Sequence, residues 1–192
     1  MDRESPKFRS DDPLSYQLIV YACPVGDLNS QLEDYFSKSL RLYGANKAHK
    51  YMPHCTLTGF FSDDLSSIPI YIQALEKAYT EARNNNLSLD IKIKQLTFSD
   101  NWHGLELQAE ELKNLIANFA KIENSATRQE KLRLKDWLHL SLAYDFNPKH
   151  GKNLKQLARE IIDIKADVSW ELRLYQKHPD WTWKCLHSWV LN

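Results

Sequence analysis

Two stretches decide the fold of this chain: PHCTLTGFF at residues 53–61 and LHLSLAYDF at residues 138–146. Their alternating pattern and their β-branched or aromatic content predict that both are strands. Each carries the sequence His-x-(Thr or Ser)-Leu. Because side chains alternate across a strand, His54 and Thr56 share one face of the first strand, and His139 and Ser141 share one face of the second.

The second stretch has two chemically different faces. Ala143 and Asp145 extend the face that carries His139 and Ser141. The opposite face is almost wholly apolar and consists of Leu138, Leu140, Leu142, Tyr144 and Phe146. We expect helices to cover the apolar face, and the face with histidine and hydroxyl to look into a cavity or into solvent.

The same order of elements, strand, helix, strand, helix, strand, occurs on both sides of residue 98, and the histidine stretch is the middle strand each time. This order indicates a degenerate internal duplication. The pattern predicts the first five elements at 16–24, 27–43, 52–61, 69–82 and 87–94. It predicts the next six, including a last strand, at 103–108, 112–119, 136–146, 154–164, 168–174 and 182–191.

These elements predict an α+β fold in a single domain, residues 16–192, with two similar lobes at approximately 16–98 and 99–192. We expect antiparallel sheets flanking a central cleft, with the helices outside. Residues 1–15 are dominated by charges, serines and prolines, which predicts a flexible N-terminal arm.

Composition limits the function. Lysine plus arginine and aspartate plus glutamate both total 25, so any phosphate recognition must be local and not a property of the whole surface. Three scattered cysteines indicate neither a disulfide framework nor a zinc site, which fits a reducing cytoplasm. The chain has no apolar run of the ~18 residues that a membrane span needs, and no obligate protein partner is evident.

Two histidines on matching strands fit the hydrolysis of a cyclic phosphodiester. One proton must leave the attacking water and one must reach the departing sugar oxygen. With pKa values near ~6.5, one imidazole can act as base while the other acts as acid, which predicts a bell-shaped pH profile. Thr56 and Ser141 can donate hydrogen bonds to the non-bridging phosphate oxygens. This chemistry requires no metal and no cofactor, and it leaves open which histidine is the acid and which ring bond breaks.

The two motifs resemble those of the 2H (two-histidine, LigT-like) phosphoesterase superfamily, whose members carry two H-x-(T/S) motifs in duplicated lobes around a cleft. The second stretch and the residues that follow it look particularly similar to the 2H domain of TULA-type proteins. The resemblance implies a phosphodiesterase acting on 2′,3′-cyclic nucleotides or on RNA with a 2′,3′-cyclic phosphate end. It implies His54 and His139 as acid and base, and Thr56 and Ser141 as phosphate ligands.

Several alternatives stay open at this stage. The substrate can instead be a 2′,5′ linkage, or the cleft can bind nucleotide or RNA without turnover, and each histidine can simply be a hydrogen-bonded residue of a half-exposed strand. Three cations, Lys131, Arg133 and Lys135, either guide phosphates or belong to a solvated loop. Four aromatic residues either stack a base or pack the core: Tyr21, Tyr51, Phe60 and Trp102. Of the other histidines, only His187 is placed where it could approach the cleft.

Overall fold

The computed structural model describes residues 15–192, which form one open antiparallel sheet of eight strands and four α-helices. The predicted α+β class is therefore confirmed. The strands are β1 (Ser15–Val25), β2 (Cys55–Thr56), β3 (Phe61–Asp64), β4 (Lys92–Phe98), β5 (Trp102–Gln108), β6 (His139–Tyr144), β7 (Ser169–Lys177) and β8 (Trp183–Val190). The helices are α1 (Asp27–Tyr43), α2 (Ile68–Asn84), α3 (Glu110–Ile122) and α4 (Gly151–Ile161), with short 3-10 helices η1 (Lys47–Lys50), η2 (Leu65–Ser67) and η3 (Pro148–His150). The arm predicted at 1–15 lies outside the described residues, apart from Ser15.

All eight strands belong to one sheet, whereas the sequence predicted more than one. Their order is β4-β5-β6-β2-β1-β7-β8, and β3 also pairs with β1. The two histidine stretches form the junction, because Cys55 of β2 pairs with Leu140 of β6. A single residue pair at this seam is enough to join the two groups of strands into a continuous sheet.

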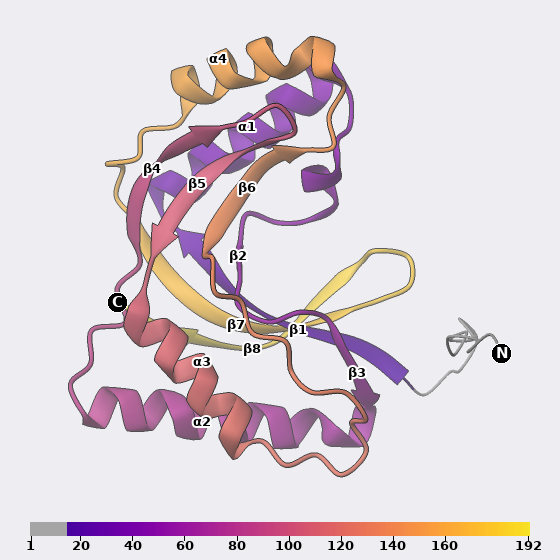
Figure 1. Ribbon diagram of the computed structural model, residues 1–192, viewed down its shortest axis with the longest axis vertical. Coiled ribbons are helices and arrows are strands. Elements are labelled where there is room, and N and C mark those ends of the chain that lie inside the picture. The colour runs from indigo at the N-terminus through magenta and orange to yellow at the C-terminus, as the bar shows by residue number, and fades with distance from the viewer. Residues whose placement is uncertain (1–14) are drawn as a thin grey trace, which may run out of the picture.

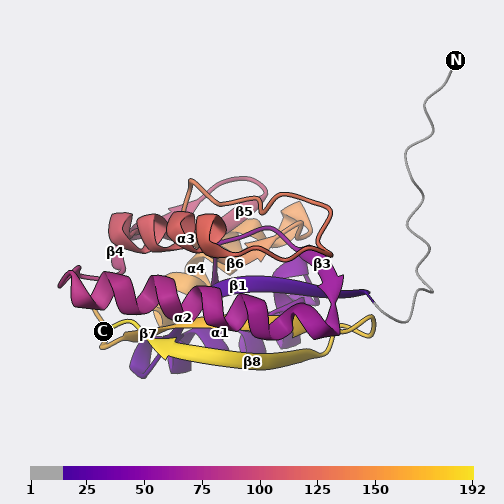
Figure 2. The same cartoon turned by 90° about the horizontal axis from the view of Figure 1, so that it is seen from below.

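Two pairs of helices lie at opposite ends of the molecule. In Figure 1, α1 and α4 lie together at one end of the molecule, with α1 behind the strands, and α2 and α3 lie together at the other end. Figure 2 shows α2 and α3 side by side in front of the sheet. Each pair combines a helix from the first half of the chain with one from the second half.

β1 is buried on both faces, as its continuous apolar run predicts. One face contributes to the large core that the helices cover, through Leu18, Val20 and Ala22. The other face contributes to a smaller cluster with Tyr175 of β7, through Ile19, Tyr21 and Cys23. β1 therefore separates the main core from a second, aromatic layer.

Two predicted strands differ from those observed. The strand predicted at 52–61 is divided into Cys55–Thr56 of β2 and Phe61 at the start of β3. The backbone between them pairs with the polar loop, where the N–H of Gly59 donates to the carbonyl of Arg133 at 2.6 Å. The strand predicted at 87–94 begins only at Lys92, which pairs with Gln108. Leu89 and Ile91 are buried although they do not pair with another strand. The alternation of apolar residues at 87–93 therefore indicates burial and not strand pairing.

Candidate functional site

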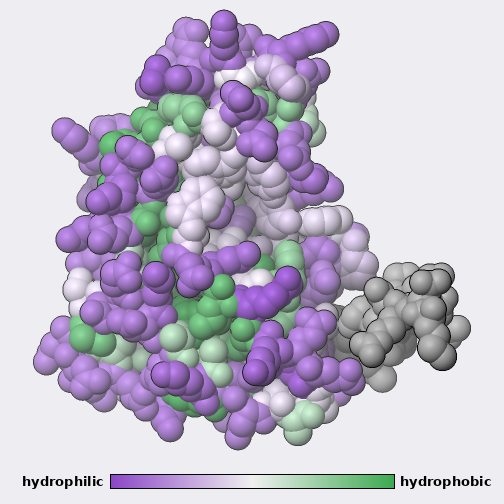
Figure 3. All heavy atoms as spheres, in the orientation of Figure 1, coloured by the Kyte–Doolittle hydropathy of each residue, from purple (hydrophilic) through white to green (hydrophobic). Residues whose placement is uncertain are grey.

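A cavity of about 500 Å³ lies over the seam between β2 and β6. The space-filling view of Figure 3 shows a hollow in the middle of this face, surrounded by pale residues of intermediate hydropathy. The four residues singled out from the sequence all line the cavity: His54, Thr56, His139 and Ser141. The structure therefore brings together side chains that lie 85 positions apart in the two motifs.

The strand register explains how the two motifs meet. Because Cys55 lies opposite Leu140 in an antiparallel pair, the same register places Thr56 opposite His139 and His54 opposite Ser141. Residues directly opposite have Cβ atoms ~5 Å apart, and diagonal neighbours are ~7–8 Å apart or less. On this register, each histidine lies opposite the hydroxyl residue of the other motif, and the two histidines are diagonal neighbours across the seam.

Both imidazoles make the same backbone contact. Nδ1 of His54 lies 2.7 Å from the carbonyl oxygen of Met52, and Nδ1 of His139 lies 3.3 Å from that of Trp137. In each motif the acceptor is therefore the residue two positions before the histidine. A carbonyl only accepts, so Nδ1 carries the proton and donates it. Nε2 is left in each ring as the atom that can take up or release a proton.

Burial lowers the pKa of both histidines. The pKa of His54 falls to about 4 because burial penalises the charged ring, although the Met52 carbonyl opposes this, and the charge of His139 lowers it further. Burial also lowers the pKa of His139, with the Trp137 carbonyl opposing and Lys135 adding to the effect. Both rings are therefore neutral at pH 7, which corrects the expectation of unperturbed pKa values near ~6.5.

Trp102 of β5 orients Ser141. Its indole Nε1 donates to Oγ of Ser141 at 2.9 Å. Because this bond occupies a lone pair, the Ser141 O–H is free to donate toward the cavity. The indole lies over Gly104, where a Cβ would overlap the Trp102 ring and the carbonyl oxygen of Leu140. Only glycine leaves room at this position for the ring that holds the serine.

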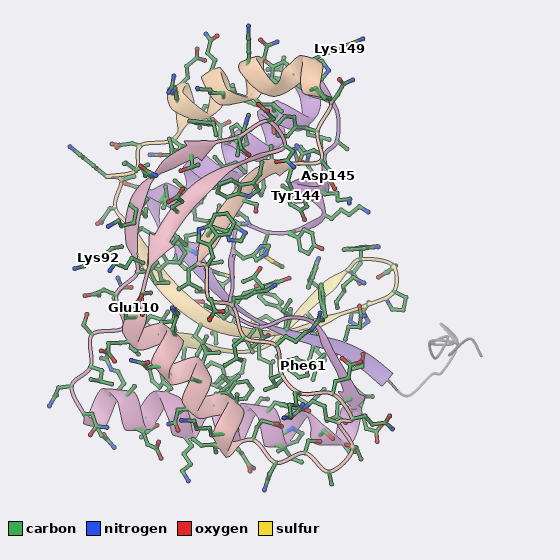
Figure 4. The ribbon with its side chains drawn as sticks, viewed as in Figure 1. Phe61, Lys92, Glu110, Tyr144, Asp145 and Lys149 are labelled. Atoms are coloured by element: carbon green, nitrogen blue, oxygen red, sulfur yellow. The ribbon has the colours of Figure 1, made fainter. Side chains whose placement is uncertain are left out.

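A β-bulge changes which residues of β6 face the cavity. His103 of β5 pairs with Ala143, but Gly104 pairs with Ser141, so Leu142 is an extra residue on β6. The bulge moves Ala143 into the core and turns Tyr144 to the cavity, which reverses the predicted assignment of these two side chains. Figure 4 labels Tyr144 and Asp145 together at the end of β6. The alternation of side chains in a regular strand cannot predict such a bulge, because the bulge depends on how β6 pairs with β5.

Aromatic rings enclose both histidines. The rings of Tyr21 and Tyr51 have centroids 3.9 and 5.3 Å from His54. Trp137 stacks on His139 at 4.0 Å, and Trp102 meets the same ring edge-on at 5.4 Å. All four aromatic residues named from the sequence, Tyr21, Tyr51, Phe60 and Trp102, line the cavity. The sequence analysis missed Trp137 and Tyr144, although the position of Trp137 two residues before His139 was a usable signal.

The polar loop before β6 brings two of its cations to the cavity. Arg133 and Lys135 line it, whereas Lys131 is absent from the lining. The N–H of Lys135 donates to the carbonyl of Leu57 at 3.0 Å, so the loop pairs with the residues that follow the first motif. Thr58 also borders the cavity, but it is fully buried, and its Oγ1 accepts from the N–H of Val20. Thr58 is a structural residue despite its place on the histidine face.

The other five histidines do not line the cavity. His49 caps η1 and contacts Ser39, and His103 is buried. His187 is exposed on β8 beside Trp189 and does not line the cavity. Between Ser15 and Asn192, no group of three or more His, Cys, Asp or Glu side chains is placed to hold a metal ion. The same stretch contains no helix with the length and apolar content of a membrane span.

Comparison with known proteins finds relatives but no matching family model. Ubiquitin-associated and SH3 domain-containing protein B of Mus musculus is 33% identical over 170 residues, which are 87% of this chain and 26% of that protein. Ecdysteroid-phosphate phosphatase of Bombyx mori is 34% identical over 175 residues, 88% of this chain and 25% of that protein. The chain is therefore homologous to one segment of these proteins, and it spans about a quarter of their length.

Proposed function

We propose that this chain is a phosphodiesterase of the two-histidine (2H) kind, which hydrolyses 2′,3′-cyclic phosphates of nucleotides or RNA ends without a metal ion. The observation that carries the proposal is the crossed arrangement of His54, Thr56, His139 and Ser141 over one cavity. The Bombyx mori relative is named a phosphatase, which is compatible with a phosphate ester as substrate. The choice of a cyclic diester rests on the site, because that relative is four times longer than the aligned segment.

We assign different roles to the two histidines because their pKa values differ. His54 has the lower pKa, about 4, so its Nε2 is the neutral base that removes a proton from the attacking water. His139 is less perturbed, and the negative charge of a bound phosphodiester raises its pKa toward protonation. Its Nε2 then donates a proton to the departing sugar oxygen.

The reaction balances with water as the only co-reactant. The water oxygen forms a bond to phosphorus while one bond from phosphorus to a ribose oxygen breaks. His54 gains the proton that the water loses, and His139 loses the proton that the ribose hydroxyl gains. Thr56 and Ser141 donate to the non-bridging oxygens, whose charge grows as phosphorus becomes five-coordinate. The product is a nucleotide or an RNA end with one phosphomonoester and one free hydroxyl.

Replacement of either histidine tests the proposal. We expect His54→Gln and His139→Gln to lower kcat/KM for 2′,3′-cyclic nucleotides by about 10²–10⁴, because each removes one proton transfer. His187→Gln is the matched control, since His187 is exposed outside the cavity. Circular dichroism checks that the variants fold. Full activity in both site variants contradicts the proposal.

Substrate and metal dependence complete the test. A panel of 2′,3′-cyclic mononucleotides, cyclic-ended RNA and a 2′,5′-dinucleotide, with products separated by chromatography, identifies the bond that is cleaved. Turnover of the 2′,5′-dinucleotide alone favours the alternative linkage. Ligand binding without turnover of any substrate favours a binding module. We expect activity to survive EDTA, and loss in EDTA with rescue by Mg²⁺ contradicts the two-histidine chemistry.

A further inference from the structure

The loop between β7 and β8 holds a tryptophan in a conformation that tryptophan rarely adopts. The N–H of Trp181 donates to the carbonyl of His178 at 3.0 Å, which closes a turn with Pro179 at its second position. Trp181 itself has φ 65°, in the left-handed region where glycine or asparagine is expected. A bulky side chain kept at such a position is a reason to look for a role for that side chain.

Trp181 gathers two lysines from distant parts of the chain. The ammonium of Lys177 lies 4.1 Å from the ring centroid of Trp181, and that of Lys50 lies 4.6 Å from the same centroid. Like charges repel, so two ammonium groups around one indole form a local positive site that an anion would stabilise. The carboxylate in this loop, Asp180, accepts hydrogen bonds from the N–H and O–H of Thr182.

The ring of Tyr51 lies between His54 and Trp181, the residue that holds the two lysines. The ring of Tyr51 is 5.3 Å from that of His54 and 5.8 Å from that of Trp181, so Tyr51 stands between the two. Trp183 and Phe60 join Tyr51 and Trp181 in an aromatic wall. The ring of Trp183 lies 5.4 Å from that of Tyr51 and stacks on Phe60 at 6.1 Å. In Figure 1, the β7–β8 hairpin stands beside the segment that leads from η1 to β2. The wall therefore runs continuously from the cavity to the hairpin tip.

The charge on another part of the rim is neutralised. Lys47 forms an ion pair with Asp145 at 2.5 Å, beside Tyr144 at the end of β6. Single-stranded nucleic acids bind to grooves that combine cations along the backbone with aromatic rings under the bases. The wall from Tyr51 to Trp181 has this composition, whereas the rim at Lys47 and Asp145 does not.

We propose that Lys50 and Lys177, gathered by Trp181, bind the phosphodiester on the 5′ side of the terminal nucleotide, so that the preferred substrate is a single-stranded RNA end and not a mononucleotide. The inference rests on the proposed function and names the substrate class of the same site. The base of the terminal or preceding nucleotide then packs on Tyr51 or Trp183. The proposal thus places one nucleotide between the scissile phosphate at the histidines and the phosphodiester at the lysine pair.

The test compares two substrates that share the reacting group. Wild-type kcat/KM is expected to be at least about 10-fold higher for an adenosine trinucleotide with a 2′,3′-cyclic phosphate than for 2′,3′-cyclic AMP. The double variant Lys50→Ala with Lys177→Ala is expected to bring this ratio close to one. Lys149→Ala with Lys152→Ala is the matched control, because Lys149 of η3 and Lys152 of α4 are both exposed and do not line the cavity. A wild-type ratio near one, or an equal change of the ratio in both double variants, overturns the inference.

Trp181→Gly separates binding from folding. Glycine adopts φ 65° without strain, so this variant is expected to be at least as stable as the wild type in urea while its trinucleotide preference falls. An unchanged preference in a folded Trp181→Gly protein overturns the role of the indole.

A titration separates this inference from the proposed function. In His139→Gln, the trinucleotide ending in a 3′-phosphate is expected to bind at least about 10-fold more tightly than 3′-AMP, with a stronger salt dependence. If the wild type hydrolyses neither cyclic substrate, the proposed function fails, and this binding ratio still decides the inference. Equal affinities overturn it, and so does equally tight binding of an acidic peptide, which would assign the lysines to a protein partner.

Discussion

The imidazoles of His54 and His139 differ from histidines in water in two respects. Each Nδ1 is tied to a carbonyl two residues earlier, and burial lowers the pKa of each ring. The first effect selects the tautomer, and the second keeps Nε2 unprotonated at neutral pH. In the proposed mechanism, the base is therefore neutral before the substrate binds, whereas the acid is protonated when the anion binds.

This difference predicts an acidic pH optimum. For kcat/KM, the ascending limb follows the free-enzyme pKa of His54 at about 4, since the base works only when deprotonated. The descending limb follows His139, whose pKa lies below the usual 6.5, since the acid works only when protonated. We expect the maximum of kcat/KM between pH 4 and 6.5, measured with 2′,3′-cyclic AMP. A maximum above pH 7.5 would show that burial does not control these rings.

Trp102 is a positioning residue for Ser141, and a double-mutant cycle can measure its contribution. Trp102→Phe removes the N–H donor but keeps an aromatic ring, so we expect kcat to fall about 5-fold, the effect of one hydrogen bond of ~1 kcal/mol, with little change in KM. In a Ser141→Ala background, the same substitution is expected to have no further effect on kcat. Additive losses in the cycle would mean that the indole acts by packing alone.

At the scale of elements, the bulge in β6 decides the shape of the cavity. Leu142 is the extra residue, and beyond it the strand presents Tyr144 where a regular strand would present Ala143. The bulge lies next to Gly104 of β5, over which the Trp102 indole packs. The extra residue Leu142 in β6 and the glycine at position 104 in β5 thus allow three side chains to line the same cavity: Tyr144, Trp102 and Ser141.

Gly104→Ala tests this arrangement. The added methyl would overlap the Trp102 ring and the Leu140 carbonyl, so either the indole or the β5–β6 pairing must shift. We expect a loss of about 1–3 kcal/mol in the free energy of unfolding, as for other overpacked sites, measured by urea denaturation. Ser188→Ala is the control, because Ser188 is an exposed residue of β8. Gly44→Ala is not used, because Gly44 has φ 79° and an alanine there would be strained. Wild-type stability in Gly104→Ala would contradict the packing described here.

At the scale of the whole molecule, a buried carboxylate joins the two halves of the chain. Asp63 of β3 is 4% exposed and accepts hydrogen bonds from Tyr71 of α2 and from Ser125 and Thr127 of the polar loop. That loop continues to Arg133, which lines the cavity. Burial tends to raise the pKa of Asp63, but the hydrogen bonds from Ser125, Thr127 and Tyr71 outweigh it and hold the pKa below its usual 3.8.

Removal of this carboxylate is expected to loosen the loop. Asp63→Ala leaves three hydroxyl groups without their acceptor, so we expect a loss on the order of 3 kcal/mol and a decrease in Tm of about 6–12 °C. Because the folded pKa is depressed, the contribution is present at neutral pH and is lost as the pH falls below about 3.8. Asp64→Ala is the neighbouring control. Equal Tm values for the two variants would contradict the anchoring role.

The sequence by itself determined the α+β class, most of the helices and the identity of the two histidine motifs. These features depend on periods of two and 3.6 residues, which are local properties of the chain. The prediction of α1 ended correctly at Gly44, whose φ of 79° closes the helix. The two motifs were recognisable because each places a histidine and a hydroxyl on one face within three residues.

Only the tertiary structure decided how the two motifs face one another, which side chains surround them and how their pKa values shift. Three features of the site join residues that are far apart in the chain: the pairing of Cys55 with Leu140, the bulge that turns Tyr144 to the cavity, and the two lysines at Trp181. Strand register and bulges depend on the partner strand, and the pKa of a histidine depends on the burial that all its neighbours create. No local pattern contains that information, because it arises only when distant segments pack together.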